Sequence, residues 1–233
     1  MERLKKKLEN YWYHYKTHTL LGLLALAVCL AALVQCASAE EYDTYITYAG
    51  PCRLYDNDLE EGAMYAASVI GRDLTGDGKV KVSFNRIFYM TEEQIRAEFA
   101  MDPTFTVPSQ EGNFEKFCRE FEAGDTVIWF VDPALYAEYA KTDDWVSMLE
   151  VLDTDTWRDL TATLPDGSFD QYSVRLLETE FGKTFFSYLP DDTLLCMRRS
   201  SNYTAMKGQT ESGEFYDRGV EAMRAIFEYG KNK

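Results

Sequence analysis

The hydrophobic and polar positions of the chain predict one long apolar helix, followed by alternating strands and helices. The run Thr19–Val34 is almost wholly apolar, and it lies within 23 residues between Lys16 and Glu40 that carry no formal charge when histidine is neutral. A helix rises about 1.5 Å per residue, so a stretch near 20 residues matches a hydrocarbon core of about 30 Å. The pattern therefore predicts a basic tail at residues 1–18, one transmembrane helix at residues 19–39, and a separate domain at residues 40–233.

The first half of that domain shows strand and helix periods in turn. Alternating or continuous apolar runs predict strands, and apolar residues at i, i+3, i+4 and i+7 predict helices. The predicted strands are Thr44–Ala49, residues 80–89 and Thr126–Val131, and the predicted helices are residues 59–70, Thr91–Ala100, residues 114–123 and residues 133–139. The clearest helix has Phe114, Phe117, Cys118 and Phe121 on one face, which we expect to be buried.

The second half predicts antiparallel pairing and a closing helix. Tyr172–Leu177 and Lys183–Tyr188 flank Phe181-Gly182 and are typical of a hairpin, Thr193–Met197 is an apolar strand, and residues 216–227 have a helical period. Strands that alternate with helices indicate right-handed crossovers. The predicted fold class is α/β, a single three-layer lobe with a mainly parallel sheet plus a C-terminal hairpin and antiparallel strand, preceded by one transmembrane helix.

Charge is divided unevenly along the chain. The net charge is −15, and residues 1–39 carry five cationic and two acidic residues, a net of +3 that leaves −18 for residues 40–233. Cationic residues before the apolar run and Glu40-Glu41 after it place the N-terminus in the cytoplasm and the domain outside, by the positive-inside rule. The acidic domain is not expected to bind nucleic acid or an anionic membrane surface.

The same N-terminal residues allow two alternatives to a retained anchor. Ala37-Ser38-Ala39 is an A-x-A site, so a signal peptide could be cleaved after Ala39. Leu33-Val34-Gln35-Cys36 resembles a lipoprotein processing site with lipid at Cys36, although Gln35 stands where a small residue is expected. All three interpretations export the domain.

The residues that most often carry catalysis are sparse in the domain. Both histidines, His14 and His18, precede or begin the membrane segment, so the domain has no Ser-His-Asp or Cys-His system and no His-ligated metal site. Of the three domain cysteines, Cys118 and Cys196 are expected to be buried, and Cys52 is expected on a loop. We therefore predict a protein that is not an enzyme, with a carboxylate-based hydrolase as the remaining catalytic alternative.

One loop resembles the opening of a calcium site. Asp73, Thr75, Asp77 and Lys79 stand at positions 1, 3, 5 and 7, with Gly78 at the turn position, but Phe84 occupies position 12, where a bidentate glutamate belongs. The loop is either an Asp/Gly turn between helix and strand or a weak calcium site that distant carboxylates complete. Calcium is the one cofactor that the sequence suggests.

The run from Phe114 to Leu152 (FEKFCREFEAGDTVIWFVDPALYAEYAKTDDWVSMLEVL) resembles a segment of bacterial extracellular solute-binding proteins of the type 2 periplasmic-binding class. With the strands at 44–49 and 79–89, the similarity covers about residues 44–152. The whole chain also resembles single-span surface proteins of anaerobic Gram-positive bacteria. The resemblance implies a lobe that binds a solute. Proteins of that family close two lobes on their ligand, whereas this chain is long enough for little more than one lobe.

Ligands of parallel α/β sheets bind beyond the carboxyl ends of the strands. That geometry selects Gly50, Pro51, Tyr55, Asp132 and Tyr136 as candidate ligand-binding residues. The predicted function is a membrane-anchored extracytoplasmic binding or interaction module, whose partner is a small solute. The alternative is a structural or assembly partner of another cell-envelope protein.

Overall fold

A computed structural model describes residues 2–37, 41–107, 109–139, 144–199 and 209–230. The chain divides into two compact units, Met1–Glu41 and Tyr42–Lys233. Each unit is described by itself.

The first unit is one helix, α1 (Glu2–Ala37). Its segment Tyr11–Ala32 is long and apolar enough to cross a membrane, by length and composition. The helix is continuous through the predicted tail, and the apolar segment begins at Tyr11, earlier than the predicted residue 19. Ser38 and Ala39 of the predicted cleavage site lie outside the described residues.

The second unit contains a five-stranded sheet in the order β2-β1-β3-β5-β4. β1 pairs in parallel with β2 on one side and with β3 on the other, while β5 pairs antiparallel with β3 and with β4. The strands are β1 (Thr44–Gly50), β2 (Val82–Phe88), β3 (Ile128–Val131), β4 (Ser173–Arg175) and β5 (Leu194–Met197). The predicted α/β class and the parallel strands of the first half are confirmed.

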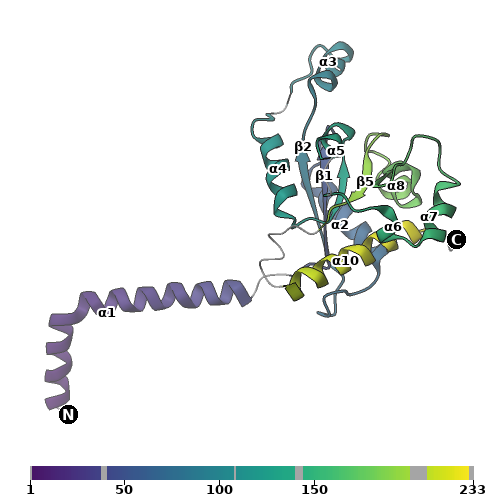
Figure 1. Ribbon diagram of the computed structural model, residues 1–233. Helices are drawn as coiled ribbons and strands as arrows, with labels where there is room; N and C mark the ends of the chain where they lie inside the picture. The colour runs from purple at the N-terminus through teal and green to yellow at the C-terminus, as the bar shows by residue number, and fades with distance from the viewer. Residues whose placement is uncertain (1, 38–40, 108, 140–143, 200–208, 231–233) are drawn as a thin grey trace. The chain divides into compact units, whose positions relative to one another are not determined.

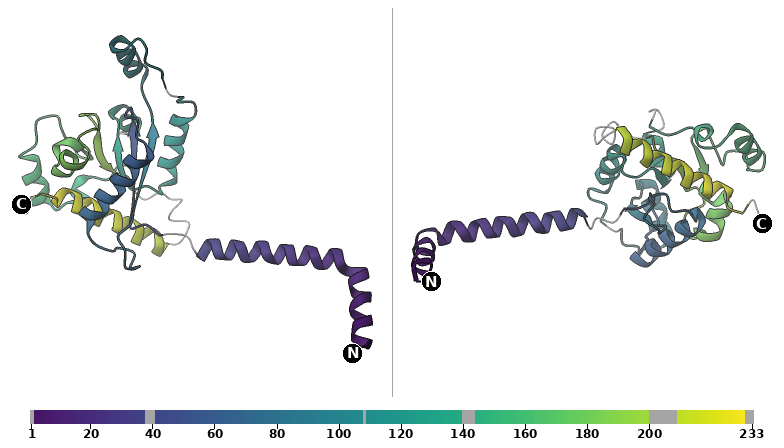
Figure 2. Two further views of the ribbon diagram at one scale, coloured as in Figure 1. Left: turned by 180° about the vertical axis from the view of Figure 1, so that it is seen from behind. Right: turned by 90° about the horizontal axis from the view of Figure 1, so that it is seen from below.

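Helices cover both faces of the sheet, which gives three layers (Figures 1 and 2). The first face is covered by α2 (Asp56–Ile70), α8 (Glu180–Phe185) and α10 (Gln209–Glu228). The second face is covered by α4 (Asn113–Ala123) and α5 (Pro133–Glu138). The remaining helices are α3 (Glu92–Met101), α6 (Met148–Val151), α7 (Thr154–Thr161) and the 3-10 helix η1 (Leu176–Glu178).

The strands alternate their side chains between two hydrophobic clusters. On the first face Phe84, Phe130 and Phe186 contact one another, with ring centroids 5.2–5.6 Å apart. On the second face Phe117 and Phe121 of α4 pack against Trp129, with centroids 5.5 and 5.6 Å away. Both faces of β3 are buried, as its continuous apolar run predicts.

The two parallel connections place their helices on opposite faces of the sheet. β1 reaches β2 through α2, and β2 reaches β3 through α3 and α4. These connections run in opposite directions along the sheet because β1 lies between β2 and β3. If both connections are right-handed and run in opposite directions along the sheet, their helices must pack on opposite faces of it. α2 on the first face and α4 on the second face meet this requirement.

The predicted hairpin is wrong in its second strand. Residues Glu180–Phe185 form α8, and Thr179 caps that helix by accepting a hydrogen bond from Gly182 N at 2.9 Å. Gly182 is therefore not a turn residue. A Cβ at this position would collide with the carbonyl oxygen of Leu176, so the glycine allows η1 and α8 to approach closely.

Two further differences from the predictions concern helices. α6 and α7 occupy a stretch where the sequence predicted no element, and Asp153 caps α7 through Thr156 N at 2.9 Å. Within α4, Phe117 and Phe121 are buried as expected, but Phe114 is 39% exposed and Cys118 is only partly buried. Phe114 instead contacts Tyr89 at the margin of the core, with centroids 5.9 Å apart.

Candidate binding site

The carboxyl ends of β1 and β2 open into a cleft of about 890 Å³. After β1 the chain turns toward α2 on the first face, and after β2 it leads to α4 on the second face. Ligands of open α/β sheets bind beyond the carboxyl ends of the parallel strands, which is the edge where this cleft lies. The topological switch point of this strand order lies between β1 and β3, whose connections lead to α2 and α5 on opposite faces. The volume lies in the range of small-molecule sites.

Five segments contribute the lining of this cleft. They are the turn after β1, the end of β2, α3, the loop after α3, and the turn that precedes β5. The lining residues are Pro51, Cys52, Arg53, Phe88, Met90, Glu98, Asp102, Thr104, Phe105, Thr106, Tyr188, Leu189, Pro190 and Asp191. The antiparallel β5 begins where the parallel strands end, which brings residues 188–191 to the same edge of the sheet.

The floor of the cleft is held by the buried side chain of Tyr48. Its hydroxyl accepts a hydrogen bond from Cys52 N at 2.8 Å. Gly50 makes room for that hydroxyl, because a Cβ at position 50 would lie 2.7 Å from the oxygen. The Cys52 thiol lies 3.9 Å from the carbonyl oxygen of Tyr188, so the first turn also contacts the turn before β5.

The wall formed by α3 is attached to the sheet mainly through its first turn. None of the ten residues of α3, all of which are described, is buried. The side-chain amide of Gln94 makes two hydrogen bonds: Nε2 donates to Asp132 Oδ2 at 2.7 Å, and Oε1 accepts from Thr91 N at 2.7 Å. Figure 1 shows α3 standing away from the helices that cover the sheet.

The return from α3 to α4 is fixed by two amides. Gln110 Oε1 accepts a hydrogen bond from Met90 N at 2.5 Å, and Asn113 Nδ2 donates to the carbonyl oxygen of Phe88 at 2.7 Å. The bonded groups belong to Phe88, the last residue of β2, and to Met90, and both residues line the cleft. The loop that completes the wall is therefore connected to the end of β2.

The five predicted ligand residues lie at the expected edge but serve different purposes. Pro51 lines the cleft and Gly50 directly precedes it. Tyr55 is 62% exposed and is the N-cap of α2. Asp132 is buried, where it caps α5 through Ala134 N at 2.8 Å and holds Gln94.

Tyr136, the fifth, is not among the residues that line the cleft. Its hydroxyl donates to Asp170, whose Oδ2 lies 2.9 Å away, and burial and the Asp170 charge raise the pKa of the phenol. It packs beside Trp145 with centroids 5.2 Å apart. The structure thus brings Gly50 and Pro51 to the cleft and uses Asp132 and Tyr136 for positioning.

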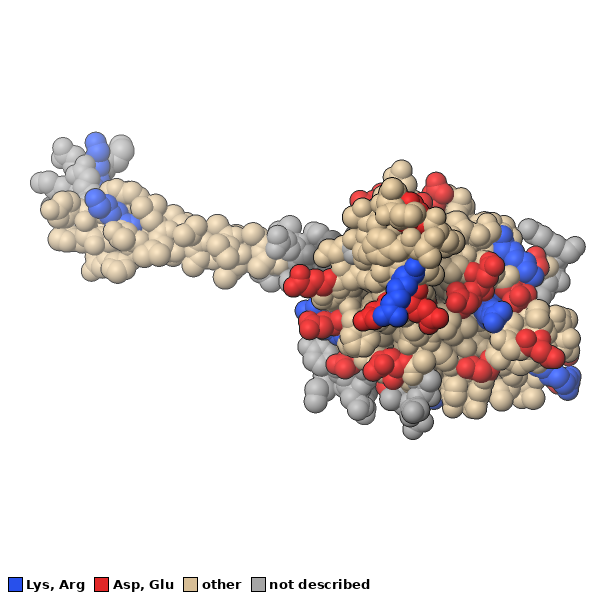
Figure 3. All heavy atoms as spheres, turned by 90° about the horizontal axis from the view of Figure 1, so that it is seen from above, with Lys and Arg blue, Asp and Glu red and all other residues tan. Residues whose placement is uncertain are grey.

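The chemistry of the cleft combines carboxylates with aromatic rings. Glu98, Asp102 and Asp191 line it together with one cation, Arg53. Figure 3 looks onto this side of the domain and shows acidic side chains spread over it, with fewer basic ones. Sequence reasoning missed these residues because they come from segments far apart in the chain.

The Cys52 thiol is poorly suited to act as a nucleophile. It lies on a loop as expected, and it is partly buried. Burial, with a smaller effect of the Asp58 charge, raises the pKa of the thiol. The thiolate, which is the reactive form, is therefore disfavoured.

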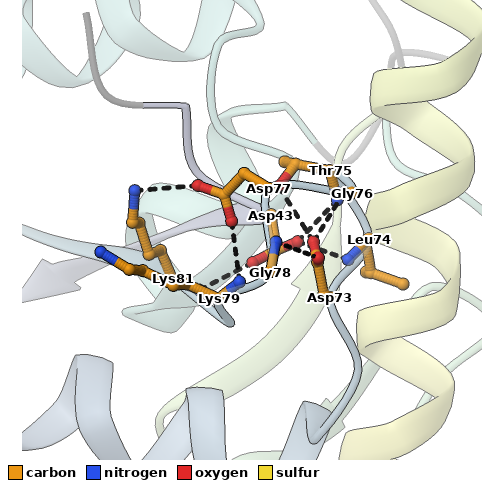
Figure 4. Close-up of polar contacts among 9 residues, drawn as sticks. All are labelled: Asp43, Asp73, Leu74, Thr75, Gly76, Asp77, Gly78, Lys79 and Lys81. Atoms are coloured by element: carbon orange, nitrogen blue, oxygen red, sulfur yellow. Dashed lines mark hydrogen bonds and ion pairs between the residues drawn. The ribbon is translucent and has the colours of Figure 1, made fainter. Parts of the chain in front are cut away.

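The loop that resembles a calcium site is held by its own hydrogen bonds (Figure 4). Asp73 Oδ1 accepts from Gly76 N and Oδ2 accepts from Gly78 N, both at 2.6 Å. Asp77 accepts from Lys79 N at 2.9 Å and forms an ion pair with Lys81 at 3.0 Å. The oxygens of Asp73 and Asp77 therefore already have donors, and Lys79 contributes its amide to this turn.

Asp43, which the sequence did not single out, is the central carboxylate of this loop. It is 1% exposed and accepts hydrogen bonds from Leu74 N and Thr75 N at 2.5 and 2.9 Å and from Lys81 N at 2.7 Å. Its own backbone N–H donates to the carbonyl oxygen of Lys81. Among the described residues, no group of three or more His, Cys, Asp or Glu side chains is arranged to hold a metal ion.

Comparisons of the chain with family models, with curated proteins and with solved structures gave no match. The cleft and the apolar helix are therefore the features of the chain that bear on its function.

Proposed function

We propose that the protein is a non-enzymatic binding module, anchored by α1, that holds a small solute in the cleft between the ends of β1 and β2. The observation that carries the proposal is the position of this cleft. It lies beyond the carboxyl ends of two parallel strands, the edge at which open α/β sheets bind ligands, and its volume of about 890 Å³ suits a small molecule.

The anchor and the charge distribution support a domain outside the cytoplasm. The segment Tyr11–Ala32 is long and apolar enough to span a bilayer. Cationic residues precede it and an acidic domain follows, which is the pattern that keeps the N-terminus inside. On intact cells, a membrane-impermeant amine reagent should label Lys79 in the domain, and the mass of the mature protein should include residues 1–39.

The binding proposal is tested with the full chain in nanodiscs of phosphatidylcholine. A thermal-shift screen covers sugars, amino acids, short peptides and amines, because a ligand at 100 times its Kd stabilises the folded state by about 2.7 kcal/mol. Thr104 lines the cleft, so Thr104→Trp should abolish the shift that a hit produces. Thr163→Trp places the same side chain at an exposed turn elsewhere and should keep the shift.

Two results would contradict this proposal. Either no compound of these classes raises Tm, or the hits stabilise the Thr104→Trp variant as much as the parent chain. In the second case the ligand binds outside the cleft.

A second candidate function, an assembly partner of another envelope protein, is favoured by the surface of α3. Phe99 is 42% exposed and Met101 is 74% exposed on a helix that stands apart from the core. A photoreactive amino acid at position 101 should crosslink to one protein in intact cells if this function holds. The same group at Met64, which is 58% exposed on α2, is the matched control.

A further inference from the structure

We infer that the ligand of the cleft is a small organic cation with an apolar body, such as an arylalkylamine. The inference rests on the proposed binding function and specifies the class of solute. It depends on three properties of the lining: its charge, its aromatic rings and the distribution of both over its segments.

The charge of the lining is negative. The lining has three carboxylates, from Glu98, Asp102 and Asp191, and a single guanidinium, from Arg53, and its other side chains carry no formal charge. Within the described part of the chain, neither Glu98 nor Asp191 forms an ion pair with a basic side chain. Both carboxylates can therefore approach an ammonium group, whereas an anion would meet a net repulsion.

Aromatic rings provide the second recognition element. Phe88, Phe105 and Tyr188 come from the end of β2, the loop after α3 and the turn before β5. The face of an aromatic ring attracts a cation, and the ring also offers apolar surface for a hydrocarbon body. Burial raises the pKa of Tyr188 to about 12, so its phenol stays neutral at physiological pH and adds no charge of its own.

A ring and a carboxylate occur together on each of two segments of the lining. Glu98 belongs to α3 and Phe105 to the loop that follows it, while Tyr188 and Asp191 belong to the opposite turn. A molecule that fills the cleft therefore meets both a ring and a carboxylate on each side. An amine joined to an aryl or alkyl body satisfies both, which a purely polar cation such as a metal ion does not.

The test uses three probes that share one ring and differ in charge. Phenethylamine is a cation, 2-phenylethanol is neutral and phenylacetate is an anion at pH 7. Their affinities for the full chain in phosphatidylcholine nanodiscs are measured by ligand-observed NMR, with empty nanodiscs as the blank. We expect phenethylamine to bind about 10-fold or more tightly than 2-phenylethanol, and phenylacetate to bind most weakly.

Charge-removing variants locate the effect in the cleft. The double variant Glu98→Gln with Asp191→Asn should weaken phenethylamine about 10-fold and change 2-phenylethanol less than about twofold. The unchanged alcohol shows that the variant is folded and that its cleft is intact. The matched control, Glu93→Gln with Asp166→Asn, removes two exposed carboxylates outside the lining and should leave all affinities unchanged.

Ionic strength gives an independent readout. Raising the salt concentration from about 0.05 M to about 0.5 M screens exposed charges, so it should weaken the amine and leave the alcohol nearly unchanged. Equal salt dependence for both probes would contradict an electrostatic preference.

The cationic class is overturned if the alcohol or phenylacetate binds as tightly as the amine, if the double variant leaves the amine unchanged, or if no probe binds. The binding function is judged separately. If a compound of another class raises Tm and Thr104→Trp abolishes that shift, the cleft remains a binding site and only the proposal of a cationic ligand is rejected. Absence of any such hit rejects both.

Discussion

The hydroxyl of Tyr48 accepts a hydrogen bond from the backbone N–H of Cys52 at 2.8 Å, and this bond connects the buried core to the floor of the cleft. Tyr48 lies in β1, which has a strand on either side, and Cys52 lies in the turn that lines the cleft. Burial raises the pKa of the phenol, which stays protonated at physiological pH. The shape of the floor thus depends on a side chain that is itself fixed by the sheet.

Removing this hydroxyl should destabilise the domain by a small amount. Tyr48→Phe leaves the Cys52 N–H without its partner, which costs about 1 kcal/mol and should lower Tm by about 2–4 °C for a domain of this size. Differential scanning calorimetry of the full chain measures the change. Tyr65→Phe removes an exposed hydroxyl, 3.4 Å from Glu61, and should leave Tm unchanged; equal losses in both variants would contradict the role of the Tyr48 bond.

Gln94→Leu should release α3 without unfolding the domain. The substitution removes the bond from Gln94 to Asp132 at 2.7 Å, and α3 has little apolar contact to replace it. Hydrogen exchange should therefore become faster in residues 91–101 while Tm changes by less than about 2 °C. Glu93→Gln on the same helix is the control. Unchanged hydrogen exchange in the Gln94 variant would show that other contacts hold α3 in place.

Asp43→Asn should be the most destabilising single carboxylate substitution in the domain. The buried carboxylate accepts three backbone hydrogen bonds, and an amide directs its NH₂ group at one of these donors. Lost charge-assisted bonds and the unpaired donor together cost about 3 kcal/mol, or roughly 6–12 °C in Tm. Calorimetry compares this variant with Asp77→Asn, which changes an exposed carboxylate of the same loop. Equal decreases in Tm for the two variants would contradict the prediction for Asp43.

Acid should loosen the same loop below about pH 4. Hydrogen bonds, chiefly from Gly78 N, hold the pKa of Asp73 below its ordinary value of 3.8, and the Lys81 side chain does the same for Asp77. A lowered pKa in the folded state contributes stability that is complete above the unfolded value and is lost as the pH falls through the folded value.

The amide resonances of Gly76 and Gly78 report this titration directly. Their midpoint should lie below pH 3.8 in the full chain and near 3.8 in a peptide of residues 70–82, in which the turn is not held. A midpoint in the protein at or above that of the peptide would show that the turn does not favour the carboxylate.

The strands and longer helices were predictable because their local patterns agree with the fold. Phe117 and Phe121 lie one turn apart on α4, and Gly124 ends that helix with a φ of 75°, as its glycine suggests. The apolar run at 126–131 marks β3, and Asp132-Pro133 marks the start of α5. In each case one short segment carries the complete signal.

The second half of the sheet was less predictable because one signal had two physical meanings. Gly182 suggested a turn, whereas its actual reason is the close approach of Leu176 across the molecule. The capping signal of Thr179 followed by Glu180 was present and favours the helix that forms. Tertiary contact thus determines which interpretation of the glycine applies.

The sequence predicts at which edge of the sheet the cleft lies, but not which residues line it. The edge of the sheet follows from the parallel strands, and it selects Gly50 and Pro51 correctly as residues at that edge. The lining also requires knowledge that β5 is antiparallel and that Gln94 holds α3 beside the sheet. No local pattern around Glu98, Tyr188 or Asp191 contains that information.

The packing of α10 determines when the domain can complete its fold. α10 covers β1 and α2, and Met223 and Ile226 are buried against the first face of the sheet. Gly219 lies so close to Val127 that a Cβ would come 2.5 Å from that side chain. Part of one face of β1, a strand made early in synthesis, therefore stays uncovered until a helix made much later reaches it. Such long-range pairing slows folding, and a chain interrupted before α10 would leave the ribosome with the apolar face of its central strand exposed to proteases and aggregation.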